Sequence, residues 1–163
     1  MKMQRMYAAK LLQSNMMKTK TIPNEELIPE FGRLVQEGAE VVFRPKGMSM
    51  LPFIRGGKDS VALVKAEGLK VGDIVLAKVR GGAFVLHRID SMVDDVIVLM
   101  GDGNLTGMER CTADDVLAVA ARILKDNKEI DCRSARHMRR AMLWKRLLPV
   151  RRYMLAIYRR IYL

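Results

Sequence analysis

Short apolar runs separated by turn residues dominate the middle of the chain. Six such runs lie at 40–43, 60–66, 73–79, 83–89, 95–100 and 115–124. Gly, Asp and Asn fill the intervals, as in GG at 81–82 and GDGN at 101–104, and these residues favour turns. The intervals leave no room for crossover helices. We therefore predict a mainly β domain with an antiparallel-rich, coiled or barrel-like sheet.

The 163 residues divide into three parts. Residues 1–23 show no clear periodicity and are predicted to be a loose arm. Residues 24–38 predict a short helix, because Asn24 can cap it, Gly38 can end it and apolar residues recur on one face. This helix opens a domain at 24–132, and residues 133–163 form a tail. Two Cys and two His supply no recognisable metal-ligand set, so we predict neither a metal nor a cofactor.

The positive charge is concentrated in the tail. The net charge of the chain is +11. Residues 1–132 contain 19 Lys and Arg against 18 acidic residues, whereas residues 133–163 contain ten Lys and Arg and no acidic residue. Apolar residues recur in the tail at spacings of three or four: Leu143, Leu147, Val150, Met154, Ile157 and Ile161. The pattern predicts one basic amphipathic helix, or two short helices joined near Pro149.

Three interpretations of the tail stay open. Its apolar stripe could pack on the domain or on a partner, with the charges solvated. It could instead lie on an anionic membrane surface, or contact nucleic-acid phosphates without sequence specificity. No apolar run approaches the roughly 20 residues that span a bilayer, and no secretory signal is recognised. We therefore expect a cytoplasmic protein, peripheral on the cytoplasmic membrane face if the tail binds lipid.

Three segments contain residues suited to catalysis. Ser49 follows a predicted strand between a flexible Gly and a rigid Pro. There its hydroxyl can be exposed, and the backbone N–H groups of Ser49 and Met50 can meet a developing oxyanion. His87, the only His of the predicted β domain, could act as general base, and Asp102 could orient it. Taken singly, each has an ordinary interpretation as a turn serine, a strand histidine or a turn aspartate.

The order of the segments is more specific than any one of them. It runs GMSMLPFI at 47–54, GGKDS at 56–60, VGDIVLA at 71–77, VLHRI at 85–89 and GDGN at 101–104. This order resembles the serine peptidase superfamily of the type I signal peptidases and the LexA-type self-cleaving repressors. The resemblance covers residues 43–104, with a weaker continuation to about 124, and it implies the coiled β fold of those peptidases.

Within that superfamily the general base separates two branches. Bacterial signal peptidases and LexA-type proteins use a Ser–Lys dyad, whereas archaeal and endoplasmic-reticulum signal peptidases have a His followed by Arg and Ile or Val. The chain is similar to the His branch. The resemblance implies that Ser49 is the nucleophile, His87 the general base and acid, and Asp102 a supporting carboxylate. The His branch usually has a further Asp beyond GD-x-N, and Glu109 is the alternative supporting acid there.

The implied function is a serine endopeptidase that cleaves an extended peptide or leader at a small-residue site. Signal peptidases normally carry an N-terminal transmembrane helix and LexA-type repressors a DNA-binding domain. We recognise no such helix, and residues 1–38 are too short for a DNA-binding domain. The alternative is a catalytically inactive binding module that keeps the peptidase fold and uses its basic tail on a membrane or nucleic acid.

Overall fold

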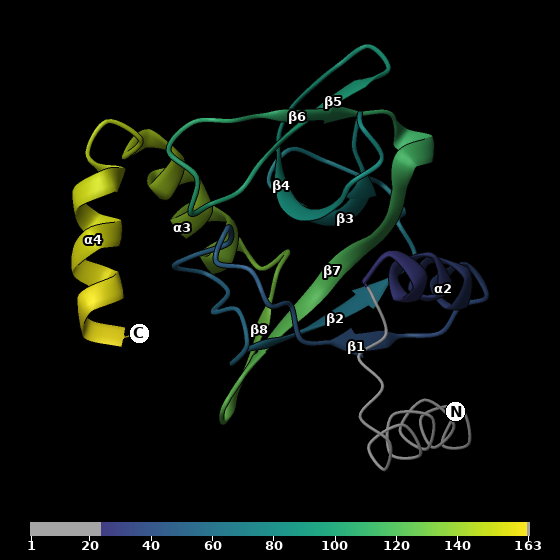
Figure 1. Cartoon of the computed structure of the whole chain (residues 1–163), viewed down its shortest axis with the longest axis horizontal. Helices are drawn as coiled ribbons and strands as arrows, with labels where there is room; N and C mark the ends of the chain where they lie inside the picture. The colour runs from purple at the N-terminus through teal and green to yellow at the C-terminus, as the bar shows by residue number, and fades with distance from the viewer. Residues whose placement is uncertain (1–23, 163) are drawn as a thin grey trace.

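The computed structural model describes residues 24–162 (Figure 1). The arm predicted at 1–23 lies outside these residues. One antiparallel sheet of eight strands and three α-helices make up the described chain. The prediction of a mainly β, antiparallel fold is confirmed.

The elements follow one another as α2 (Asn24–Gln36), β1 (Val41–Phe43), β2 (Ser60–Val64), β3 (Ile74–Lys78), β4 (Phe84–Val93), β5 (Val96–Met100), β6 (Glu109–Cys111), a 3-10 turn (Ala113–Asp115), β7 (Val116–Lys125), β8 (Lys128–Asp131), α3 (Ala135–Arg146) and α4 (Arg151–Tyr162). Each of the six predicted runs overlaps an observed strand, and β4 and β7 extend beyond the ends of their runs. Strands β6 and β8 were not predicted, because their sequences, ERC and KEID, contain no apolar run.

The strands are ordered β1-β2-β7-β3-β4-β5-β6, and β8 also pairs with β7. Register shifts interrupt the β2–β7, β3–β7 and β4–β5 pairings. Such bulges bend a strand and increase its twist. The long strands β4 and β7 therefore curve as they cross the molecule (Figure 1).

Strand β7 lies inside the sheet and contributes to two apolar clusters. Ala118 and Ala120 belong to one cluster, together with Val35 of α2. Val116 and Val119 belong to the other, together with residues of β3, β4 and β5. Burial of a Val side chain stabilises a fold by about 1.5–3 kcal/mol. A nearly continuous apolar sequence is what a strand buried on both faces requires.

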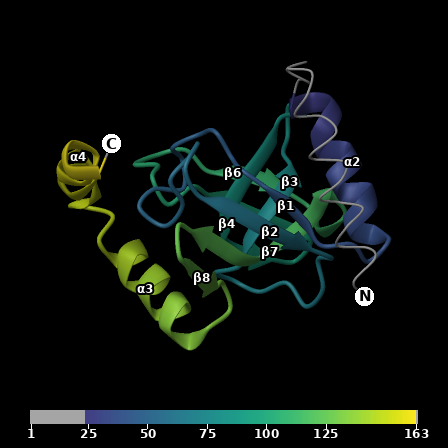
Figure 2. The same ribbon diagram turned by 90° about the horizontal axis from the view of Figure 1, so that it is seen from below.

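The tail forms two helices, α3 and α4, separated by a short segment that contains Pro149. Of the two arrangements that the sequence allowed, the two-helix one is observed. Ser134 caps α3 by accepting a hydrogen bond from the His137 backbone N–H. Both helices lie at the end of the molecule opposite α2 (Figure 2).

Polar contacts fasten the tail to the domain. Arg133 pairs with Asp73 at 2.7 Å, and Lys145 pairs with Asp90 at 2.8 Å. The buried Trp144 donates a hydrogen bond from Nε1 to the carbonyl oxygen of residue 102 at 2.7 Å. The tail is therefore an integral part of the structure.

Most of the predicted apolar stripe does not pack on the domain. Of its residues, Leu147 packs against the cluster of Leu51, Trp144 and Leu155. The tail residues that are buried instead are His137, Ala141, Trp144, Arg151 and Leu155. Leu143, Ile157 and Ile161 remain 59%, 61% and 66% exposed. The break near Pro149 is the reason, because a single helical repeat drawn through it joins residues from two separate helix surfaces.

His137 makes the docking of α3 sensitive to acid. Burial, together with the positive charge of Arg88, lowers the pKa of His137 from 6.5 to about 4. The unfolded chain binds this proton below about pH 6.5, but the folded chain binds it only near pH 4. Stability linked to His137 is therefore complete above pH 6.5 and falls as the pH drops toward 4, by about 3 kcal/mol.

We expect the urea midpoint of the wild type to fall between pH 7 and pH 4 more steeply than that of His137→Phe. Phe keeps the aromatic contact with Phe53 and cannot bind a proton. Equal slopes for the two proteins would contradict the assignment.

Candidate functional site

The loop that contains Ser49 joins β1 to β2 and is closed at its base by a buried ion pair. Asp59 is fully buried and accepts hydrogen bonds from the backbone N–H of Arg55 at 2.7 Å and from its guanidinium at 2.6 Å. Burial would raise the pKa of Asp59, but these hydrogen bonds and the nearby Lys125 ammonium outweigh it and lower the pKa. The carboxylate therefore stays charged and fixes the loop.

Ser49 and His87 line the same pocket, of about 200 Å³. Its walls include Ile28 from α2, Phe43 from β1 and Leu86 from β4. Within residues 24–162, no hydrogen bond joins the Ser49 hydroxyl to the imidazole. Catalytic hydrogen bonds are commonly long without substrate and tighten in the substrate complex. The structure thus brings the predicted nucleophile and base to one pocket.

Glu109 is the carboxylate that contacts His87. The distance from His87 Nδ1 to Glu109 Oε2 is 3.0 Å. His87 comes from β4 and is buried, whereas Glu109 begins β6, and β5 pairs with both strands. A neutral imidazole that donates its Nδ1 proton to Glu109 presents an unprotonated Nε2. That is the tautomer a general base requires.

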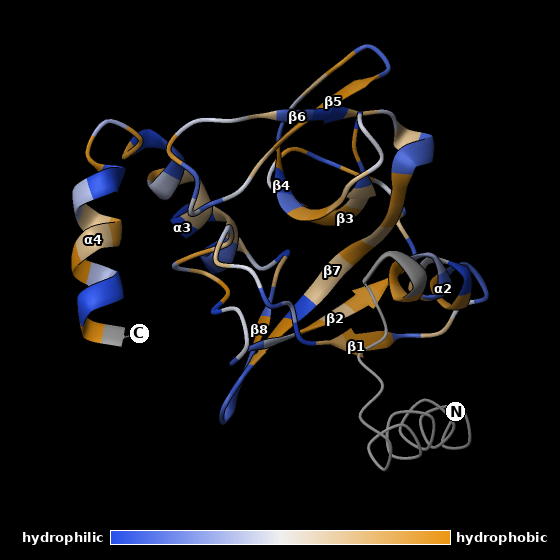
Figure 3. Cartoon of the chain, in the orientation of Figure 1, coloured by the Kyte–Doolittle hydropathy of each residue, from blue (hydrophilic) through white to orange (hydrophobic). Residues whose placement is uncertain are grey.

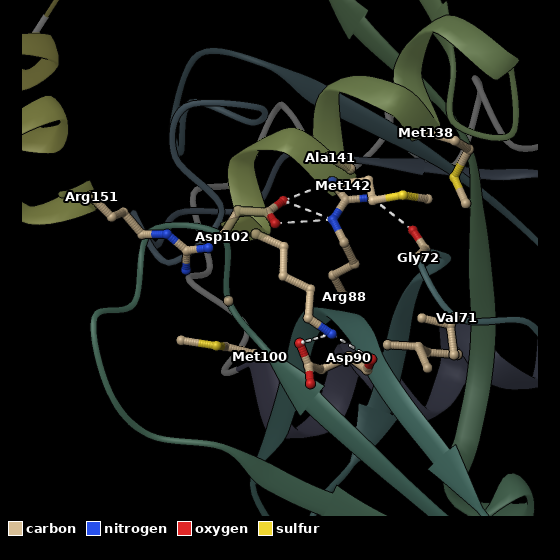
Figure 4. A pocket seen from close by; sticks show the side chains of 13 residues that line it. Val71, Gly72, Arg88, Asp90, Met100, Asp102, Met138, Ala141, Met142 and Arg151 are labelled. Atoms are coloured by element: carbon tan, nitrogen blue, oxygen red, sulfur yellow. Dashed lines mark hydrogen bonds and ion pairs between the residues drawn. The ribbon is translucent and has the colours of Figure 1, made fainter. Parts of the chain in front are cut away.

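Asp102, predicted as the carboxylate that supports His87, lies elsewhere. Its two oxygens accept hydrogen bonds from Arg88 Nε at 2.9 Å and Nη2 at 2.7 Å, and Arg88 Nη1 donates to the Gly72 carbonyl at 2.7 Å (Figure 4). Successive residues of a strand point to opposite faces, so His87 and Arg88 face different partners. The contact with His87 that was expected of Asp102 is made by the alternative carboxylate, Glu109.

The GDGN turn, residues 101–104, packs against the backbone of the Ser49 loop. The Gly103 N–H donates to the Ser49 carbonyl at 2.7 Å. A Cβ atom at Gly101 would lie 2.5 Å from that same oxygen, and one at Gly103 would lie 2.6 Å from the Met48 carbonyl. Both glycines are therefore needed for this close approach, and the Arg88–Asp102 pair holds the turn that carries them.

The backbone N–H groups of Ser49 and Met50 are the predicted oxyanion donors. Neither donates a hydrogen bond to an acceptor in the described part of the chain, whereas the N–H of Leu51 donates to the Met48 carbonyl at 3.2 Å. Two adjacent N–H groups thus remain available beside the Ser49 side chain. Such donors stabilise an oxyanion when they lie within hydrogen-bond distance of it.

Sequence reasoning missed the contribution of the tail to this region. Arg151 is buried and donates to the Asn104 carbonyl at 3.0 Å, and Trp144 binds the carbonyl of residue 102. Burial lowers the pKa of Arg151. The single Trp of the chain was the available signal, because the indole N–H of a buried Trp usually finds a hydrogen-bond partner.

The cysteines do not provide an alternative nucleophile. Cys111 and Cys132 are both free and buried, and burial raises the pKa of their thiols to about 11 and about 12. Thiols with such pKa values stay protonated at neutral pH and react poorly. Between residues 24 and 162, no three His, Cys, Asp or Glu side chains gather where they could hold a metal ion. No helix of that range has the length and apolar character needed to cross a membrane.

Neither a known family model nor a curated protein matches the chain, so its function is inferred from the geometry of the site and from the motifs given above.

Proposed function

We propose that the chain is a serine endopeptidase of the signal peptidase type, in which Ser49 is the nucleophile, His87 the general base and Glu109 the carboxylate that orients His87. The observation that carries the proposal is the 3.0 Å contact between His87 Nδ1 and Glu109 Oε2. It sets the tautomer of an imidazole that lines the pocket of Ser49. A nucleophile, a base and a group that orients the base form the arrangement of a serine catalytic triad.

The reaction follows from these positions. Ser49 Oγ attacks the carbonyl carbon of the scissile peptide while His87 Nε2 takes the hydroxyl proton. The carbonyl oxygen becomes an oxyanion, which the N–H groups of Ser49 and Met50 stabilise. The C–N bond then breaks, His87 gives its proton to the leaving amine, and an acyl ester remains on Ser49. Water, deprotonated by His87, hydrolyses the ester and restores the hydroxyl.

The substrate is an extended peptide. Strand β1 stands at one end of the sheet order, and its Phe43 lines the pocket of Ser49. A strand with an unpaired edge can bind a peptide by main-chain hydrogen bonds, which fixes the register of the scissile carbonyl. Small residues beside the cleavage site are an expectation from the resemblance alone.

A fluorophosphonate probe tests the proposal, because it forms a covalent bond with an activated serine. We expect labelling of the wild type at Ser49, mapped by peptide mass spectrometry, and none of Ser49→Ala. Ser91→Ala is the matched control, since Ser91 lies on β4 outside the pocket, and it should label like the wild type.

Equal labelling of the wild type and Ser49→Ala would overturn the assignment of the nucleophile. A folded wild type that binds peptides but neither reacts with the probe nor cleaves them would instead identify the non-catalytic binding module.

A further inference from the structure

Helix α4 carries an apolar face that the domain does not cover. One side of the helix holds it to the molecule through the buried Arg151 and Leu155. Another side, the outer face, consists of Val150, Tyr153, Met154, Ile157 and Ile161, which are all between 40% and 66% exposed. Residues at these spacings form one stripe on a helix. Figure 3 shows apolar positions between strongly polar ones along α4.

Basic residues accompany the outer face. At 3.6 residues per turn, Arg160 lies next to Ile157 on the surface of α4, and Arg152 and Arg159 lie farther round the helix. All three are exposed. Helix α3 adds the exposed side chains of four arginines: Arg136, Arg139, Arg140 and Arg146. Residues 133–163 contain no acidic residue that could neutralise this charge.

We propose that the outer face of α4 docks on an anionic membrane. The apolar side chains would enter the boundary between headgroups and acyl chains, and the neighbouring arginines would contact acidic headgroups. An apolar stripe beside arginines favours lipid over the other possible partners. Contact with nucleic-acid phosphates requires only the charge and leaves five exposed apolar residues unexplained. A second copy of the chain would bring two strongly basic surfaces together, which like-charge repulsion opposes.

Membrane docking is compatible with access to the Ser49 pocket. No residue of the outer face lines that pocket, and α4 lies at the end of the molecule opposite α2, which contributes Ile28 to the pocket (Figures 1 and 2). The docking proposal stands on the tail alone and does not depend on peptidase activity.

Vesicle flotation with the full chain tests the proposal. We expect the wild type to float with vesicles of phosphatidylcholine and phosphatidylglycerol, and not with phosphatidylcholine alone. The double variant Ile157→Ser/Ile161→Ser should lose affinity by about tenfold or more per residue, because each Ile would no longer be buried. Val93→Ser/Val96→Ser is the matched control, since these residues are 63% and 41% exposed on the β4–β5 hairpin, and it should bind like the wild type.

A site-specific probe identifies the face that contacts the lipid. Both native cysteines are buried, so a cysteine introduced at the surface can be labelled selectively with a polarity-sensitive fluorophore. The emission of a label at Ile157→Cys should shift to the blue when anionic vesicles are added. A label at Ala156→Cys, one residue away among the arginines, should change little.

Each other outcome would overturn the proposal. If the wild type does not float with anionic vesicles at low salt, the outer face of α4 does not bind membranes. Full binding by Ile157→Ser/Ile161→Ser means that charge alone attracts the protein. Binding of duplex DNA at a salt concentration that releases the vesicles identifies nucleic acid as the occupant.

Discussion

Replacing Glu109 with Gln is expected to lower kcat for peptide cleavage by about 10³-fold, with little change in folding stability. Gln has the size of Glu but no charge, and its amide can donate a hydrogen bond to His87 Nδ1. That bond favours the tautomer with a proton on Nε2, which cannot accept one from Ser49. Glu109 is 29% exposed at the start of a short strand, so the fold depends little on its charge.

Steady-state kinetics on a fluorogenic peptide, with a thermal melt of the same samples, separate these effects. Glu129→Gln is the control, because Glu129 also lies on a short strand but pairs with Arg122 and has no contact with His87. It should keep wild-type activity. Wild-type kcat in Glu109→Gln would remove Glu109 from the mechanism. If Asp102→Asn is folded and stable but inactive, Asp102 would be the carboxylate that supports His87.

Asp102→Asn is expected to destabilise the fold by about 3–5 kcal/mol, since it leaves the Arg88 charge buried without a partner. The side chains of the Arg88–Asp102 pair are 9% and 7% exposed. Asn keeps the shape of the side chain, so the loss measures charge rather than volume. Urea unfolding monitored by circular dichroism gives the free energy of unfolding.

Two further variants make this measurement specific. Arg88→Met/Asp102→Leu removes both charges and should recover most of the lost stability, because no unpaired charge stays buried. Glu40→Gln breaks the more exposed pair with Arg122 and should cost about 1 kcal/mol or less. A loss as small as this in Asp102→Asn would show that the Arg88–Asp102 pair does not hold the turn.

Most of the sheet was predictable from sequence, because six of its strands coincide with apolar runs of strand length that lie between turn residues. The run at 115–124 forms most of β7, which the structure shows to be buried on both faces. Glu109 was harder to place, because β6 has three residues and no pattern of its own. Sequence order places Asp102 and Glu109 both downstream of His87, but only the folded turn decides which carboxylate reaches Nδ1.

In the tail, the helices were predictable from sequence but their packing on the domain was not. Its pattern predicted one helix or two short ones, but the periodic apolar residues did not identify which side chains pack on the domain. Helices α3 and α4 dock through a small apolar cluster of Leu51, Trp144 and Leu155. Specific hydrogen bonds from Trp144 and Arg151 to backbone carbonyls add to it. A hydrophobic repeat does not report such bonds, because they depend on single donors that meet particular acceptors.

The bond between Trp144 Nε1 and the carbonyl of residue 102 gives the protein an intrinsic optical reporter. The chain has one Trp, so its fluorescence arises from a single indole that touches the turn beneath the Ser49 loop. Separation of the tail from the domain would hydrate this indole and move its emission to longer wavelength. The Trp144 emission can therefore be followed without any label while peptide, vesicles or acid are added. Each change in emission would report on the same contact between the tail and the domain.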